Sequence, residues 1–235
     1  MRGHRRESEY NHLPERKESR TIVSDLVFQQ GQRLVFIGDS ITDAGRRKEA
    51  APYGNGYVHL ARAFLVARYP GLGLDIVNQG IGGNTIRDLE RRWEEDVIAL
   101  QPDWLSIKIG INDVWRQVQQ QPQQAVLLDE YTSTYDRLLR RTREATPARL
   151  ILMEPYVIEQ DRADLFRATI DSYLPVVHRL AREYDAILIR TQQAFDEALA
   201  AQPATFWAND RVHPFTPGHA VIARAFLRGV GYGDV

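Results

Sequence analysis

From about residue 32 onward, the hydrophobic residues form short runs of strand length that alternate with amphipathic stretches of helix length. Apolar runs rich in β-branched residues are typical of strands buried on both faces of a parallel sheet. The runs are RLVFIG at 33–38, LDIVNQG at 74–80, WLSIKIG at 104–110, RLILMEP at 149–155 and AILIR at 186–190. The helical patterns lie at 56–69, 85–100, 124–145, 162–184 and 217–228.

The regular alternation of strand and helix predicts an α/β fold, a three-layer α/β/α sandwich with a five-stranded parallel sheet of the flavodoxin-like type. We expect a single domain over residues 23–235. Residues 1–22 carry many charges and few apolar side chains, which predicts a polar, poorly packed N-terminal arm. Pro175 should kink or split the helix that contains it. The glutamine-rich segment RQVQQQPQQ at 116–124 is predicted to be a surface loop or helix edge.

Composition and charge narrow the function classes. The chain has 235 residues, of which 43% are hydrophobic and 26% charged, as in ordinary globular proteins. A formal charge of -1, with both signs interspersed, argues against a nucleic-acid or anionic-membrane partner. Without cysteine there can be no disulfide or thiolate chemistry, which fits a reducing compartment. We see no secretory signal and no membrane span, and therefore expect a cytoplasmic protein.

The stretch LVFIGDSITD at 34–43 carries the first chemical signal, because a buried strand runs directly into Ser40. Ligands of open parallel sheets bind outside the carboxyl ends of the strands. A serine at such a position becomes a nucleophile only with a base, a group that orients the base, and donors for an oxyanion. Ser40 is a candidate nucleophile only if the sequence also contains these partners; otherwise it is part of a turn.

His213 is the strongest candidate base among the six histidines, because Asp210 lies three positions before it in WANDRVHP. That offset can bring a carboxylate to the imidazole Nδ1–H and leave Nε2 free to accept the proton of Ser40. Taken alone, Asp210 could equally cap a turn beside an incidental histidine. The other histidines lie in the arm or in helical patterns and are interpreted as surface or packing residues: His4, His12, His59, His178 and His219.

Two further segments could supply oxyanion donors. NQGIGGNT at 78–85 leaves a strand through glycines, so the backbone N–H of Gly83 can approach a ligand without interference from a Cβ atom. IGIND at 109–113 places the carboxamide of Asn112 at the exit of another strand. Donors of these two kinds are what acyl transfer requires. Each segment by itself could be only a turn.

In this order, the four segments G-D-S, G-G-N-T, G-x-N-D and D-x-x-H resemble the SGNH hydrolases, also called the GDSL family. The resemblance implies that Ser40 is the nucleophile and that His213, oriented by Asp210, is the base. It also implies an oxyanion hole made by Ser40, Gly83 and Asn112, and it requires neither a metal ion nor an organic cofactor. The resemblance extends over nearly all of the chain beyond the N-terminal arm.

Within that family, the segments at 78–117 and 210–227 look like the bacterial intracellular acetylxylan esterases. That resemblance implies deacetylation of xylo-oligosaccharides or related acetylated sugars through an acyl-enzyme, and it favours a homo-oligomer. Tyr53, Trp115 and Trp207 are candidates for stacking on sugar rings, although large aromatic residues also serve as core. Trp207 lies three positions before Asp210, whereas this family tends to place a tryptophan next to the catalytic aspartate, which leaves the shape of the acyl pocket open.

Three alternatives stay open at this point. A lipase or thioesterase of the same family would share the catalytic segments and differ in the pocket walls. A metal-dependent phosphohydrolase could use Asp39 and Asp113, but the chain lacks both a D-x-D motif after the first strand and a phosphate-binding loop. A non-catalytic carbohydrate-binding protein on the same fold is the third, because a fold does not guarantee activity.

Overall fold

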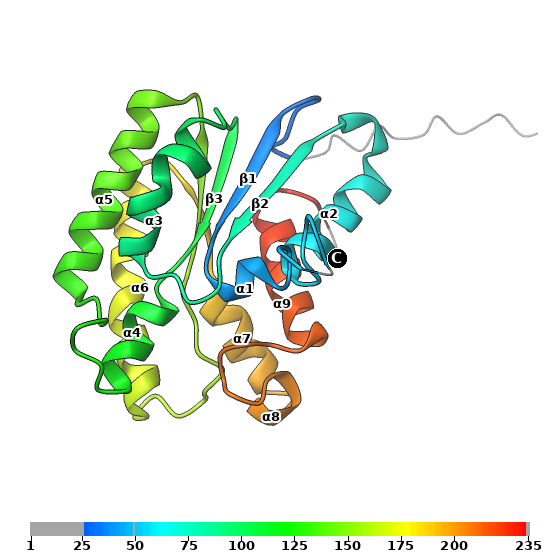
Figure 1. Ribbon diagram of the computed structural model, residues 1–235. Coiled ribbons are helices and arrows are strands. Elements are labelled where there is room, and N and C mark those ends of the chain that lie inside the picture. The colour runs from blue at the N-terminus through cyan, green and yellow to red at the C-terminus, as the bar shows by residue number, and fades with distance from the viewer. Residues whose placement is uncertain (1–25, 49, 234–235) are drawn as a thin grey trace, which may run out of the picture.

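The computed structural model describes residues 26–48 and 50–233, so the predicted arm at 1–22 lies outside the described residues. Its sheet has five parallel strands in the order β2-β1-β3-β4-β5, which confirms the predicted α/β fold (Figure 1). The strands are β1 (Arg33–Gly38), β2 (Asp75–Gly80), β3 (Trp104–Lys108), β4 (Arg149–Met153) and β5 (Ile187–Ile189). The strand order changes direction between β1 and β3, where such sheets open a ligand crevice.

Helices cover both faces of the sheet. The α-helices are α1 (Ser40–Asp43), α2 (Tyr57–Arg68), α3 (Ile86–Trp93), α4 (Ile111–Val118), α5 (Leu128–Ala145), α6 (Leu165–Glu183), α7 (Thr191–Leu199), α8 (Ala204–Trp207) and α9 (Thr216–Gly229). A 3₁₀ turn follows α2 (η1, Pro70–Leu72), and a π-helical turn extends α3 (η2, Glu94–Ile98). Helices α3, α5 and α6 form one layer, and α2 packs against α9 in the other (Figure 1).

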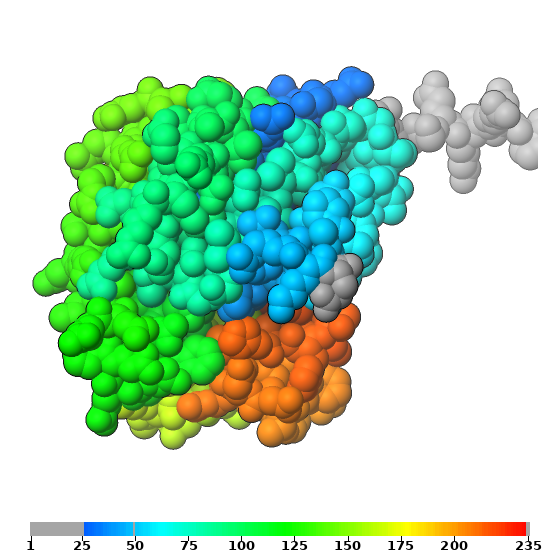
Figure 2. All heavy atoms as spheres, viewed as in Figure 1, coloured from blue at the N-terminus to red at the C-terminus, as the bar shows by residue number. Residues whose placement is uncertain are grey.

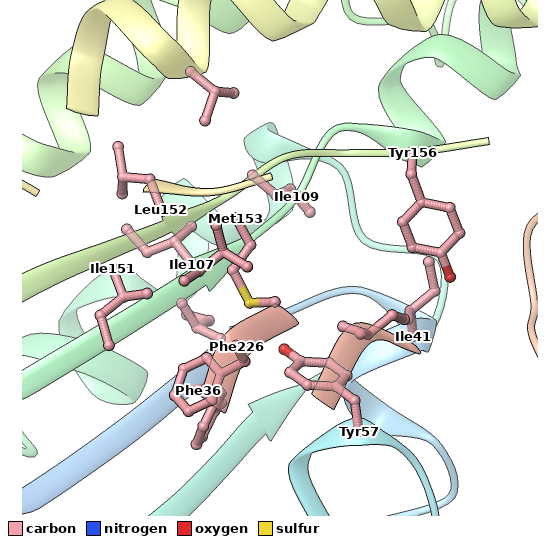
Figure 3. Packing of buried hydrophobic residues seen from close by; sticks show 14 of the residues in the cluster. Phe36, Ile41, Tyr57, Ile107, Ile109, Ile151, Leu152, Met153, Tyr156 and Phe226 are labelled. Carbon is pink, nitrogen blue, oxygen red and sulfur yellow. The ribbon is translucent and has the colours of Figure 1, made fainter. Parts of the chain in front are cut away.

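The core lies between the sheet and these two layers. On one face, the ring of Phe36 from β1 lies 5.0 Å from that of Phe226 in α9 and 5.9 Å from that of Tyr57 in α2 (Figure 3). On the other face, the indole of the fully buried Trp93 in α3 donates a hydrogen bond to Thr142 in α5 at 3.1 Å. Residues 34–38 of β1 are all buried between these layers, which holds the carboxyl end of the strand firmly.

The expected effect of Pro175 is corrected in one respect, because α6 runs unbroken from Leu165 to Glu183. A proline removes one backbone donor and crowds the preceding turn. The side chains of Tyr173, Val177 and Leu180 are buried on both sides of it and anchor both halves of the helix in the core. Tertiary packing therefore outweighs the local cost. None of the helices in the described residues is long and apolar enough to cross a membrane.

Candidate active site

The end of β1 places Ser40 at the carboxyl edge of the sheet. Asp39 caps α1, its carboxylate accepting the N–H of Ile41 at 3.0 Å, and Ser40 is the first residue of that short helix. A Cβ atom at Gly38 would lie 2.3 Å from the backbone oxygen of Lys108, so only glycine fits between β1 and β3 at this point. The G-D-S sequence thus has a local reason: close strand packing, then a helix cap, then an outward-facing hydroxyl.

A chain of hydrogen bonds joins Ser40 to His213 and Asp210. The Oγ atom of Ser40 lies 2.7 Å from Nε2 of His213, and Nδ1 of His213 lies 2.6 Å from Oδ2 of Asp210. The second oxygen of Asp210 accepts the backbone N–H groups of Val212 at 3.0 Å and His213 at 2.8 Å. Partial burial acts to raise the pKa of Asp210, but these hydrogen bonds hold it below its ordinary value. The carboxylate is thus kept ionised beside the imidazole.

The loop between α8 and α9, which carries Asp210 and His213, is fixed by contacts with the segment that follows β4. The buried hydroxyl of Tyr156 donates to the backbone oxygen of Val212 at 3.1 Å. The N–H of Ile158 donates to the backbone oxygen of Arg211 at 2.8 Å. In Figure 2 the blue surface around α1, the green surface around α4 and the orange surface around α8 adjoin, so these segments reach one face.

The predicted oxyanion donors also come to this place. Ser40, Gly83, Asn112 and His213 line one cavity of about 240 Å³. Gly83 has a φ of 80°, which favours glycine, and within the described part of the chain neither its N–H nor that of Ser40 donates a hydrogen bond. One N–H of the Asn112 carboxamide donates to the backbone oxygen of Asn84 at 2.9 Å, which fixes its orientation. The site therefore presents donors of the kind that an oxyanion needs.

Two buried carboxyl groups support these loops. Oδ2 of Asp43 accepts the N–H of Gly82 at 3.1 Å, beside Gly83. Oδ1 of Asp113 accepts the N–H of Ile86 at 3.0 Å, at the start of α3, and burial raises the pKa of Asp113 to about 7. Over residues 26–48 and 50–233, no His, Asp and Glu side chains group in threes as they would around a metal ion.

Among the aromatic candidates, the structure brings only Trp115 to Ser40. The Trp115 indole lines the same cavity, and its ring lies 5.8 Å from the His213 imidazole. Trp207 lines a different cavity between α7 and α9, and its indole donates to the backbone oxygen of Gln202 at 3.2 Å. Tyr53 lines neither cavity that contains Ser40. Residue type alone cannot say to which side of a loop a ring turns, which is why all three were candidates.

The remaining described histidines near the sheet have packing roles. His219 in α9 is buried, accepts the backbone N–H of Tyr57 through Nδ1 at 3.3 Å, and has its pKa lowered to about 4 by burial. His178 in α6 hydrogen-bonds to the buried carboxylate of Glu154. Neither imidazole reaches Ser40 by a hydrogen bond, in agreement with the interpretation of the sequence.

Sequence reasoning missed Lys108, the last residue of β3, which lies opposite Gly38 in the sheet, two residues before the nucleophile. Its side chain is fully buried, and Nζ lies 4.4 Å from the ring centre of Tyr156 without a hydrogen-bond partner among the described residues. Burial raises the pKa of the adjacent Asp39, and the positive charge of Lys108 acts in the opposite direction. The available signal was a lysine within the otherwise apolar run WLSIKIG.

Sequence reasoning also missed Arg47 and Lys48, which together with Gly82 line another cavity of about 430 Å³ that contains Ser40. Arg47 pairs with Asp43 at 3.1 Å. Ser40 thus lines two cavities, one shared with His213 and Trp115 and one shared with Arg47 and Lys48. An ester bound at Ser40 therefore has two spaces open to it.

The fold and the site define an acyl hydrolase, and the comparison with family models agrees. The chain belongs to the GDSL-like Lipase/Acylhydrolase family, whose model matches residues 36–221. This range contains Ser40, Gly83, Asn112, Asp210 and His213. The chain is accordingly a carboxylic ester hydrolase of the GDSL type.

More specific similarity is to acetylxylan esterase. The acetylxylan esterase of Geobacillus stearothermophilus is 47% identical over 209 residues, which are 86% of this chain and 95% of the relative. Its crystal structure superimposes with a TM-score of 0.83 over 87% of this chain and 96% of that one. Structures of its catalytic mutants carry alanine in place of an aspartate, a serine or a histidine. LAE5, an alpha/beta hydrolase enzyme from the metagenome of Lake Arreo, is 43% identical, with a TM-score of 0.83 over 87% of this chain and 97% of its own.

Proposed function

We propose that this protein removes acetyl groups from xylo-oligosaccharides through an acyl-enzyme formed on Ser40. The observation that carries the proposal is the hydrogen-bonded series Asp210–His213–Ser40, at 2.6 Å and 2.7 Å, which opens on the cavity lined by Gly83 and Asn112. The similarity to an acetylxylan esterase supports the substrate class. The catalytic mutants of that relative, in an aspartate, a serine and a histidine, support the residue types.

In the first step, His213 accepts the proton of Ser40 through Nε2 while Oγ attacks the acetyl carbon. The resulting oxyanion is bound by the backbone N–H groups of Ser40 and Gly83 and by the side chain of Asn112. A carboxamide has two N–H donors. Because one of them is held by the backbone oxygen of Asn84 at 2.9 Å, the other is free to serve the oxyanion without first having to be oriented.

In the second half of the reaction, the tetrahedral intermediate collapses and the imidazolium of His213 gives its proton to the departing sugar oxygen. A water molecule deprotonated by the same imidazole then attacks the acetyl-enzyme and releases acetate. Asp210 stabilises the imidazolium and keeps the proton on Nδ1 in the neutral state. The hydrogen bonds that lower the pKa of Asp210 ensure that it remains a carboxylate throughout.

The size of the cavity next to His213 suits a small acyl group. Its volume is about 240 Å³, and the indole of Trp115 forms one wall. We therefore expect kcat/KM to fall steadily from acetyl to butyryl to octanoyl esters of p-nitrophenol. Acetylated xylo-oligosaccharides should release acetate, which a pH-stat measures directly.

Two results of that experiment would contradict the proposal. A preference for the octanoyl ester, with no acetate released from the sugars, would point to a lipase or thioesterase of the same family. Binding of acetylated xylo-oligosaccharides with no release of acetate would point to a carbohydrate-binding protein instead. Activity should also survive EDTA and be lost to a serine-directed organophosphate, whereas a metal-dependent hydrolase would show the reverse.

We further propose that the protein acts in the cytoplasm as a homo-oligomer. The absence of cysteine and the resemblance to intracellular acetylxylan esterases support this setting. Light scattering coupled to size exclusion should give a mass that is a multiple of the 27.0 kDa of one chain. A monomeric mass at micromolar concentration would contradict it.

A further inference from the structure

Two cavities adjoin along one side of Ser40 and share two wall residues. The first, of about 240 Å³, contains Ser40 and His213. The second, of about 220 Å³, extends between the start of α3 and the glutamine-rich segment that follows α4. Gly83 and Arg116 line both. The space open to a ligand therefore continues past Gly83, away from the reacting hydroxyl.

The second cavity is polar, and the charges of its arginines near α3 are compensated. Arg87 pairs with Glu130, and Arg91 pairs with Asp88 at 3.0 Å. Gln123 and Gln124 line the opposite wall. Both are exposed, and in the described residues their carboxamides make no hydrogen bonds. Arg116, which lines both cavities, has no ion pair within the described residues, and its Nη1 donates to Oε1 of Gln121 at 3.3 Å. A surface of free amides, paired charges and one such guanidinium offers donors and acceptors to uncharged groups such as sugar hydroxyls.

The glutamine-rich segment is held in position from within. The side chain of Gln117 donates to the hydroxyl of Tyr173 at 2.7 Å and to the backbone oxygen of Val126 at 3.0 Å. The backbone N–H of Gln121 donates to the backbone oxygen of Arg116 at 2.9 Å. Gln117 thus holds the backbone of the segment in place, so ligand binding has to order only the side chains that face the cavities.

We propose that this second cavity is a binding subsite for a further sugar unit of an acetylated xylo-oligosaccharide. The acetylated unit lies against Trp115 with its ester at Ser40. The next unit passes Gly83 and Arg116 and is bound through its hydroxyls by Gln123 and Gln124. The inference rests on the proposed function, because it assigns the direction in which that oligosaccharide leaves Ser40. It also gives the glutamine-rich segment, otherwise unexplained, a role in selecting longer substrates.

The test is the double variant Gln123→Ala, Gln124→Ala, assayed with acetylated xylotetraose, acetylated xylose and p-nitrophenyl acetate. Loss of two hydrogen bonds should raise KM for the tetraose about ten-fold with kcat unchanged. The two small substrates do not reach the subsite, so their kinetics should stay at the wild-type values. The matched control is Gln29→Ala, Gln30→Ala, another adjacent exposed pair, which should change nothing.

Two outcomes would overturn the subsite. An unchanged KM for the tetraose would show that the segment does not touch the substrate. Equal losses on all three substrates would show that the glutamines act through the fold or the catalytic groups. Failure of the proposed function looks different, because it is seen in the wild type: hydrolysis of p-nitrophenyl acetate without release of acetate from either sugar.

Discussion

The substitution Asp210→Asn separates the charge and hydrogen-bond pattern of the carboxylate from its shape. Oδ1 of Asp210 accepts two backbone N–H groups, from Val212 and His213, at 3.0 Å and 2.8 Å. An asparagine keeps both bonds only if its carbonyl oxygen takes that position. Its NH₂ group then faces Nδ1 of His213, which must become an acceptor and carry its proton on Nε2. That tautomer cannot accept the proton of Ser40.

The size of the loss follows from the geometry and the exposure. A carboxylate and an imidazolium about 4 Å apart attract each other by about 1 kcal/mol in water and about 4 kcal/mol near a protein surface. The side chains of His213 and Asp210 are 45% and 40% exposed, so the value lies between these limits. The loss of this attraction alone should lower kcat/KM by between about five-fold and about a thousand-fold.

The assay is kcat/KM for p-nitrophenyl acetate at pH 8, with thermal denaturation to show that the variant is folded. The matched control is Asp75→Asn, which neutralises an exposed aspartate at the start of β2 that pairs with Arg33, and it should stay within two-fold of wild type. If Asp210→Asn stayed within about three-fold of wild type, the reasoning about charge and tautomer would be refuted.

Three further substitutions test the donors and the supports of the loops. Asn112→Ala should lower kcat by about a hundred-fold with little change in KM, since an oxyanion donor contributes about 3 kcal/mol; an equal rise in KM instead would assign it to substrate binding. In the folded protein the pKa of Asp113 is raised to about 7, whereas its ordinary value is 3.8. Between these two pH values only the folded state keeps the proton, so the free energy of unfolding falls as pH rises. Urea unfolding at pH 5 and pH 8 should show a drop in the free energy of unfolding of up to about 3 kcal/mol, which Asp113→Asn should remove; an equal drop in the variant would contradict the assignment. Gly80→Ala would place a Cβ atom 2.2 Å from a backbone nitrogen of α1 and should lower the free energy of unfolding by more than about 2 kcal/mol. Gly71→Ala is the control, because its Cβ atom would meet open space. Equal melting temperatures for the two variants would refute the clash.

The strands were predictable because each is a continuous apolar run, and the first begins and ends as expected at 33–38. Others end earlier than their runs: β3 stops at Lys108, although Ile109 is still buried. Apolar character marks burial rather than strand pairing, and at the carboxyl edge the two diverge. The helix α4 was hidden for a related reason, since its first turn directly follows an apolar run and reads as a strand exit, and its last turn leads into the glutamine-rich segment.

The site was predictable only as a set of four segments. Ser40 and His213 are 173 residues apart, and no local pattern connects them. That they meet could be predicted because the carboxyl ends of parallel strands share one edge of the sheet, and because the four segments resemble those of a known family. Local sequence does not specify how side chains pack. It therefore could not predict that Trp115 lies in the site, that Trp207 lies outside it, or that the amine of Lys108 is buried.

The central claim is that Ser40 is the nucleophile of an acetyl esterase, and acetate release by Ser40→Ala tests it most directly. Substitution removes only a hydroxyl at a partly exposed position, so the melting temperature should stay within a few degrees of wild type. The rate of acetate release from acetylated xylo-oligosaccharides should fall by at least about a thousand-fold. A folded Ser40→Ala variant that released acetate at the wild-type rate would contradict the account.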